Sequence, residues 1–179
     1  MTLYRFKYLC VALFLIVQGT LWAQYDPLPR TYRDMYLGMS IENLQEALIN
    51  DNLFHYRGER DVSFLPASNQ NVIETTGFSF IRRAFFQLRE GQLFTMAFVL
   101  NTTLIDYYSV FTTFVNRYGD PTSLDPRQAV WENGETRISI ERPLTVRYID
   151  MAVFNQLTDE SRVTEARETR LREEFLNDF

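Results

Sequence analysis

The residues best suited to chemistry lie in one short segment, residues 51–61. His55 is the single histidine of the 179-residue chain, and Asp51, Glu59 and Asp61 lie close to it in sequence. A histidine beside a carboxylate can act as a general acid or base because its pKa lies near neutrality. With Asp51 or Glu59, His55 would form such a pair, and with Glu59 and Asp61 it would form an incomplete metal site.

Neither spacing matches an established ligand or catalytic pattern. The chain also contains no G-x-S-x-G, no H-E-x-x-H and no phosphate-cradling glycine loop. We therefore predict a protein that is not an enzyme and that has no cofactor and no metal site. An enzyme would instead need a cleft in which His55 meets two carboxylates. The arginines beside aromatic residues favour an interaction surface, because Arg and Tyr often anchor interfaces. Its candidate residues are Phe54, His55, Tyr56, Arg57 and Arg60.

The amino terminus predicts export. Arg5 and Lys7 precede the apolar run Tyr8 to Val17, and Ala23 follows at a plausible cleavage point, as in a secretory signal peptide. The run is shorter than the roughly 20 residues that a membrane-spanning helix needs. We expect residues 1–23 to be the signal peptide and no integral membrane span after its cleavage. A signal retained as an anchor is the alternative.

Removal of residues 1–23 leaves sixteen basic residues against twenty-three acidic ones, a net charge of about −7. This balance opposes affinity for nucleic acid, which needs a basic surface. The single cysteine, Cys10, lies in the predicted signal, so the exported chain has no disulfide or thiolate site. We predict a periplasmic location and a fold that depends on its hydrophobic core.

Two helices and two hairpins are predicted in residues 24–157, a single domain. The first helix begins at the N-cap Ser40 and ends near Asn50, with Ile41, Leu44 and Leu48 on one face. The second follows Asp106 and ends at Gly119. Its apolar stripe is formed by Tyr107, Phe111, Phe114, Val115 and Tyr118.

Each helix is followed by antiparallel strands. Residues 61–65 and 71–75 are short β-prone runs, and residues 78–88 and 92–100 form a hairpin about Glu90 and Gly91. Residues 128–132 and 136–141 form a second hairpin about Asn133 and Gly134, and residues 144–149 add a strand. The fold class is therefore α+β, with two αββ-like halves. Residues 25–36, the lead-in, are expected to be an extended segment on the surface.

Strand alternation distinguishes the two hairpins. In the second, Arg137, Ser139 and Glu141 alternate with apolar residues, which predicts one wet face. In the first, Phe94, Met96 and Phe98 are assigned to one face, and the other face is apolar as well. This strand pair would lie mid-sheet, with the helices on one side and residues 151–157 or the lead-in on the other. Alternatively, Phe94, Met96 and Phe98 form an exposed patch that binds a partner or an apolar ligand.

Residues 158–179 predict a charged helical tail. Glu168 and Arg172 have the spacing of a helical ion pair, and Val163, Ala166, Leu171 and Phe175 form a thin apolar stripe. We expect a largely solvated helix, with docking to another protein as the alternative. Leu171 and Phe175 are its candidate contact residues.

A resemblance rests on three stretches of residues: 37–41 entering a helix, 116–121 leaving one, and 129–132 opening a hairpin. Here the chain resembles small bacterial envelope proteins built from helix-plus-hairpin units. These are the BamE-like domains and periplasmic proteins of spirochaetes. BamE-like domains act by binding, so the resemblance implies no catalytic residues. The chain departs from BamE-type proteins in lacking a lipid-anchor cysteine after its signal.

The sequence thus predicts a non-enzymatic periplasmic or envelope protein that acts through protein contacts in assembly or as a scaffold. Its partner would be another envelope protein or a second copy of itself. The alternative is a carrier for an apolar ligand. A carrier needs an enclosed cavity lined by residues such as Phe86, Phe94, Met96 and Phe98, whereas a scaffold needs a filled core and an exposed apolar or aromatic patch.

Overall fold

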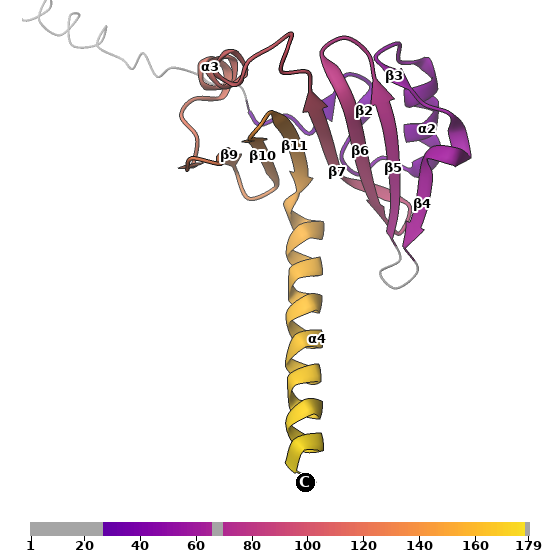
Figure 1. Cartoon of the computed structure of the whole chain (residues 1–179), viewed down its shortest axis with the longest axis vertical. Helices are drawn as coiled ribbons and strands as arrows, with labels where there is room; N and C mark the ends of the chain where they lie inside the picture. Colours follow the sequence, from indigo (N-terminus) through magenta and orange to yellow (C-terminus); the bar gives the residue numbers. More distant parts are fainter. Residues whose placement is uncertain (1–26, 66–69, 178–179) are drawn as a thin grey trace, which may run out of the picture.

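The computed structural model describes residues 27–65 and 70–177. Its main element is a nine-stranded antiparallel sheet, in the order β3-β5-β6-β7-β11-β10-β9-β8, with β4 also paired to β5 (Figure 1). The predicted signal peptide and the turn at residues 66–69 lie outside the described residues. The strands of the sheet are β3 (Phe54–His55), β4 (Val62–Leu65), β5 (Gln70–Gly77), β6 (Ile81–Arg89), β7 (Gln92–Leu100), β8 (Ser123–Leu124), β9 (Gln128–Glu132), β10 (Thr136–Glu141) and β11 (Thr145–Asp150).

The two predicted helices form where their caps place them. Ser40 accepts a hydrogen bond from the Asn43 amide (3.3 Å), and Asp106 accepts one from the Ser109 amide (2.9 Å). Gly119 ends the second helix with a φ of 79°, a backbone conformation that glycine adopts without strain. The helices of the structure are α2 (Ile41–Asn50), the short 3-10 helix η1 (Gly58–Asp61), α3 (Tyr107–Tyr118) and α4 (Met151–Asn177). The α+β prediction is confirmed.

Both predicted hairpins are present. β6 and β7 meet at Glu90 and Gly91, which both have positive φ, and β9 and β10 meet at Asn133 and Gly134. The predicted start of the first strand of the β6–β7 hairpin is wrong by three residues. β6 starts at Ile81 rather than at residue 78, because a tight turn with Ser79 at a φ of 55° connects β5 to it.

The lead-in, residues 25–36, was predicted to lie on the surface; its described side chains are exposed or half-buried except that of Met35, which is fully buried. It forms a two-stranded hairpin of β1 (Thr31–Tyr32) and β2 (Met35–Tyr36). Met35, Leu37 and Met39 are buried in the main core, on the same side of the sheet as the predicted helices. These alternate residues, interrupted by polar or exposed ones, are the signal that the prediction missed.

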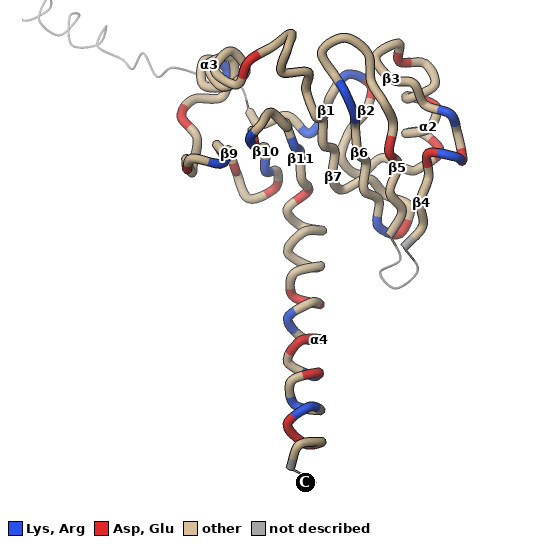
Figure 2. Tube along the Cα trace, viewed as in Figure 1, with Lys and Arg blue, Asp and Glu red and all other residues tan. Residues whose placement is uncertain are grey.

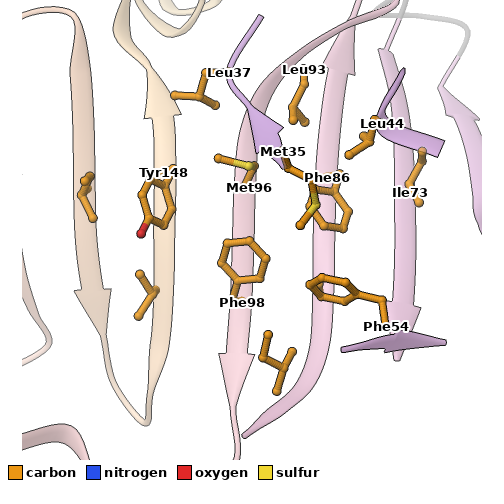
Figure 3. Close-up of a cluster of buried hydrophobic side chains, with 14 of the residues drawn as sticks. Met35, Leu37, Leu44, Phe54, Ile73, Phe86, Leu93, Met96, Phe98 and Tyr148 are labelled. Atoms are coloured by element: carbon orange, nitrogen blue, oxygen red, sulfur yellow. The ribbon is translucent and has the colours of Figure 1, made fainter. Parts of the chain in front are cut away.

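The core occupies one face of the sheet. Phe98 lies near its centre, with its ring 4.2 Å from Tyr32, 5.9 Å from Phe86 and 6.2 Å from Tyr148. Figure 3 shows these aromatic residues of β6, β7 and β11 beside Phe54 and Met35, which approach from other elements. The prediction that β6 and β7 lie in the middle of the sheet is confirmed.

A β-bulge changes which residues share a face of β7. The register with β6 shifts between Gln87 and Leu88, so that Gln87 pairs with Thr95 while Leu88 pairs with Leu93. Leu93 therefore joins Met96 and Phe98 in the core cluster. Phe94 was predicted to share their face, and this is wrong. The extra residue of the bulge interrupts the strict alternation of the strand, so that Phe94 does not join them.

Helix α4 begins at Met151, directly after β11, and not at residue 158. Met151 is buried, and Phe154 and Leu157 are half-buried near the lower end of the sheet. Residues 151–157 were expected to cover the second face of the β6–β7 hairpin. These partly buried residues provide some of that cover. Beyond these residues the same helix continues downward, away from the sheet (Figure 1).

Candidate protein-interaction surface

The most prominent surface feature is the projecting part of α4. Every side chain from Asp159 to Leu176 is exposed. Helix α4 is 27 residues long, about 40 Å at 1.5 Å per residue, and most of it stands clear of the sheet (Figure 1). Large apolar side chains are among the exposed ones, with Val163 at 70%, Leu171 at 50% and Phe175 at 62% exposure.

Charged residues of both signs alternate along the projecting part, as Figure 2 shows. Two ion pairs lie within the helix, Arg162 with Asp159 (3.6 Å) and Arg170 with Glu174 (3.7 Å). Such exposed pairs contribute only about 0.3 to 0.5 kcal/mol each. The projecting helix therefore gains little stability from its own surface, in contrast to a helix packed on a sheet.

The base of α4 is held by its N-cap, Asp150. One oxygen of Asp150 accepts hydrogen bonds from the amides of Ala152 (3.0 Å) and Val153 (3.2 Å), while the other is paired with Arg30. Arg30 also donates to the hydroxyl of Thr136 (3.2 Å). A single carboxylate thus caps the helix and joins it to the lead-in, which fixes the point where α4 leaves the sheet.

Two further contacts hold the first turns. The Arg89 Nη2 at the end of β6 lies 2.7 Å from Glu160 Oε1, and the guanidinium carbon of Arg137 lies 5.3 Å from the centre of the Phe154 ring. The Arg89 side chain is mostly buried, so this ion pair is better shielded from solvent than those farther along the helix. With Asp150, these contacts fix the direction of α4 relative to the sheet.

A groove of about 310 Å³ lies between the base of α4 and the second face of the sheet. Its apolar lining combines Phe94 and Ile149 of the sheet with Phe154 and Leu157 of the helix. The remaining side chains that line it are mostly polar, so the groove is an amphipathic surface rather than a closed cavity. They are Gln70, Gln87, Thr95, Arg147, Thr158 and Ser161.

A second, larger groove of about 730 Å³ adjoins the first over β9, β10 and β11. Its charges are internally paired: Arg137 Nε lies 2.6 Å from Glu132, and Arg147 Nε lies 2.9 Å from Glu141. The predicted polar face of this part of the sheet is present at Arg137 and Glu141, which are half-buried, whereas Ser139 is buried. Because each arginine faces a carboxylate, this surface offers no excess of one charge for a strongly acidic or basic ligand.

The His55 segment is organised by arginine and carboxylate pairs. Asp61 accepts hydrogen bonds from the Arg57 amide (2.9 Å) and from Arg57 Nη2 (2.6 Å), and Asp51 Oδ2 lies 2.6 Å from Arg33 Nε. Burial raises the pKa of Asp61, but the hydrogen bonds from Arg57 outweigh it and hold the pKa below its usual range. The ring of His55 meets Phe78 edge-on at 5.8 Å.

This geometry does not resemble a poised acid and base pair. Asp51 and Asp61, the two buried carboxylates near His55, are each engaged by an arginine, and His55 itself is exposed. Burial raises the pKa of the neighbouring Tyr56. Among the described residues, no group of three or more His, Cys, Asp and Glu side chains could hold a metal ion.

Four predicted contact residues are in the wrong environment for a surface. Phe54, Phe94, Met96 and Phe98 are buried. The alternative of an exposed patch of Phe94, Met96 and Phe98 is therefore wrong, and Phe54 does not belong to the exposed surface around His55. Three of them pack in the core, as Figure 3 shows, while Phe94 reaches the groove at the base of α4. Where the apolar carrier was expected to hold its ligand, Phe86, Met96 and Phe98 instead fill the core with direct ring and side-chain contacts.

The remaining predicted contact residues fall into two separate places. His55, Arg57 and Arg60 are exposed near β3 and η1, at the sheet edge beside α2, and Tyr56 is half-buried there. Leu171 and Phe175 are exposed near the end of α4, which projects away from the sheet and from β3 (Figure 1). The structure therefore does not bring the two groups together.

Sequence reasoning missed the residues that mount α4. Asp150 carried a readable signal, because an Asp directly before the helical run of residues 151–157 has the position of an N-cap. Arg89 carried none, since its partner Glu160 lies 71 residues away in sequence. The exposure of four large apolar side chains, Phe78, Phe80, Leu104 and Tyr108, was also missed.

No helix among the described residues is long and apolar enough to cross a membrane. Comparison with curated proteins and with solved structures finds no match to this chain. Similarity to BamE-like domains is therefore not shown. Membership of a family of spirochaete proteins is shown, by a family model. The family model of the TP0088 domain matches residues 30–160, from the arginine that pairs with Asp150 to the glutamate that pairs with Arg89. On this match, the chain belongs to the TP0088 domain family.

Proposed function

We propose that this protein is a non-enzymatic envelope protein that acts through protein contacts, with α4 as its docking element. The observation that carries the proposal is the exposure of every α4 side chain from Asp159 to Leu176 on a helix whose base is firmly held. A helix presented in this way offers a regular surface to a partner. The filled core supports a contact role over a carrier role.

The energetics of α4 support a partner for this helix. Most helical stability in proteins comes from packing one face of the helix against other parts of the structure. The projecting part has only a few exposed ion pairs of its own, while it presents Leu171 and Phe175 to solvent. Burial of each such side chain against a partner would contribute about 1.5 to 3 kcal/mol.

The proposed location is the periplasm. Its support is the arrangement of Arg5, Lys7, the apolar run and Ala23, together with the absence of cysteine after Cys10. Cell fractionation followed by mass spectrometry of the amino terminus tests it. The expected result is a periplasmic protein that begins at Gln24, and an intact Met1 terminus in the cytoplasmic fraction would contradict it.

The contact role is tested by crosslinking in cells, followed by purification of the full chain and of a variant truncated after Ser161. This truncation keeps Glu160 and hence the ion pair with Arg89. We expect a protein that crosslinks to the full chain and is lost from the truncated one. Equal recovery from both chains would refute α4 as the docking element, and no crosslinked protein from either would refute the contact role.

The non-enzymatic part has a separate test. His55→Ala should leave the crosslinked partner and the in-cell phenotype unchanged, since His55 makes an edge contact with Phe78 and the nearby buried carboxylates are engaged by arginines. Loss of the phenotype with unchanged folding and unchanged partner recovery would favour a catalytic role for this histidine.

A further inference from the structure

Helix α4 carries a heptad pattern on one face. Residues alternately three and four positions apart form a single seam along a helix, which is the pattern of a coiled coil. The seam has large apolar residues at both ends and small or polar residues in its middle. Its members are Phe154, Leu157, Ser161, Thr164, Glu168, Leu171 and Phe175.

The seam reads nearly the same in both directions. Phe154 and Leu157 lie at the start of α4, and Leu171 and Phe175 lie near its end, at matching distances from the midpoint of the helix. In an antiparallel pair of identical helices, the start of each helix meets the end of the other. The pattern would then bring apolar residues together at both ends of the pair.

Charges beside the seam discriminate between the two orientations. In a parallel pair, Glu160 would face the partner's Glu165, and Arg167 would face the partner's Arg172, so both contacts would join like charges. In an antiparallel pair, Glu160 would lie beside the partner's Arg167, and symmetry repeats this attraction, whereas Glu165 would face its own copy in a single like-charge contact. Glu160 also pairs with Arg89, and a carboxylate has acceptor capacity for a second arginine.

The groove at the base of α4 extends the contact onto the sheet. It is lined by Phe94 and Ile149 together with Phe154 and Leu157, the first two seam residues. The end of a partner's α4 that runs antiparallel along the seam would reach this groove with its Leu171 and Phe175. The apolar lining of the groove provides a surface for these side chains.

We propose that the occupant of the α4 seam is a second copy of this chain, in an antiparallel two-fold dimer. This inference rests on the proposed function, because it names the partner that α4 docks. From Phe154 to Phe175 the paired helices would overlap over about 33 Å. Two-fold symmetry uses the same seam in both copies, so each favourable contact occurs twice.

Analytical ultracentrifugation of the full chain tests the dimer. We expect a dimer at micromolar concentration, and the double variant Leu171→Ser with Phe175→Ser should raise the dissociation constant at least about 100-fold, since four apolar side chains per dimer are lost. The matched control is Val163→Ser, an exposed apolar residue outside the seam, which should leave the dimer intact. Circular dichroism checks that each variant keeps its helix.

Orientation is tested with single cysteines in a Cys10→Ser background and a short bismaleimide crosslinker. An antiparallel dimer predicts that Ser161→Cys and Glu168→Cys crosslink efficiently to each other when mixed. A parallel dimer predicts instead that each variant crosslinks to itself. Self-crosslinking without the mixed product would overturn the antiparallel arrangement.

The failure of this inference is distinguishable from failure of the proposed function. If the full chain is still a monomer at a concentration on the order of 0.1 mM, the second-copy proposal is overturned. If the same chain still crosslinks in cells to a different envelope protein through α4, the contact role stands with another partner. A dimer that persists after truncation at Ser161 would also overturn the proposal, because the seam would then not form it.

Discussion

Helices α3 and α4 both carry apolar residues along one face, with a thinner stripe on α4, but only the stripe of α3 is covered by its own chain. The stripe of α3, which includes Phe111, Phe114 and Val115, packs against the core. The stripe of α4 is partly covered at Phe154 and Leu157 and exposed at Leu171 and Phe175. An apolar stripe therefore shows only that a helix has a face to bury. The position of the helix decides whether its own chain covers that face.

The physical reason lies in how each helix leaves the sheet. Helix α3 is connected to β7 by a turn at Asn101 and lies across the face of β9 and β10, where Trp131 meets it. Helix α4 continues directly from β11 past the end of the sheet (Figure 1). After its first two turns it extends past the described strands, and the side chains of its seam from Ser161 onward are exposed (Figure 1).

Loss of the α3 contact should produce the largest effect. Trp131 is 2% exposed, packs at a tilt against the rings of Phe111 and Phe114, and donates its indole hydrogen to the Gly119 carbonyl (2.8 Å). Trp131→Ala should lower the free energy of unfolding by about 3 to 5 kcal/mol, through the cavity and the lost hydrogen bond. Urea denaturation measures it, and a loss below about 1 kcal/mol would contradict a core role.

The contacts that hold the base of α4 should show the next largest effect. Asp150→Ala removes the N-cap and the partner of Arg30, and it should cost about 2 kcal/mol. Amide hydrogen exchange should show faster exchange at Ala152 and Val153 than in the native chain. Unchanged protection of these two amides would show that Asp150 does not hold the base of the helix.

A smaller effect is expected in the His55 segment. Asp61→Asn weakens the hydrogen bonds from Arg57 and should cost about 1 to 2 kcal/mol near pH 7. Because the folded-state pKa of Asp61 is depressed, its charge stabilises the fold above its unfolded pKa of about 3.9. That stabilisation is lost as the pH falls through the folded pKa.

Denaturation at several pH values checks this sign. The difference in unfolding free energy between the native chain and Asp61→Asn should stay constant from pH 7 to about pH 5 and shrink below about pH 4. A difference that grows in acid would mean that the carboxyl is stabilised in its protonated form, contrary to the geometry with Arg57.

The smallest effect is expected in the projecting helix. Truncation after Ser161 should change the unfolding free energy of the sheet domain by less than about 0.5 kcal/mol when measured on monomers, because the removed side chains are exposed. Thermal denaturation at nanomolar concentration separates this intrinsic effect from dimer formation. A large loss for the monomer would show that α4 packs on its own sheet and would remove the contrast with α3.

Much of the fold was predictable because its signals are local. Ser40 and Asp106 cap helices through their own neighbouring amides, and Asn133 with Gly134 defines a hairpin within a few residues. The candidate surface was predicted less well. Leu171 and Phe175 are exposed on α4 as the charged composition of their segment suggested, whereas Phe54, Met96 and Phe98 belong to the core.

The errors share a cause, which is contact between residues distant in sequence. The bulge at Phe94 depends on how β7 pairs with β6, and the burial of Met35 depends on a hairpin that lies over the central strands. The mount of α4 joins Arg89 to Glu160 and Arg30 to Asp150. The pair of Arg89 with Glu160 depends on the assembled sheet and leaves no local trace in the sequence, whereas Met35 and Asp150 lie in local patterns whose meaning only the distant contacts decide.

The sequence by itself determined the α+β class, the boundaries of α2 and α3, the two hairpins and the presence of a charged C-terminal helix. These follow from caps, turns and periodicity, which act over a few residues. The tertiary structure alone decided which apolar stripes are covered and in which direction α4 points. That decision depends on the order of strands and the end of the sheet, because burial is a property of surfaces brought together from distant parts of the chain.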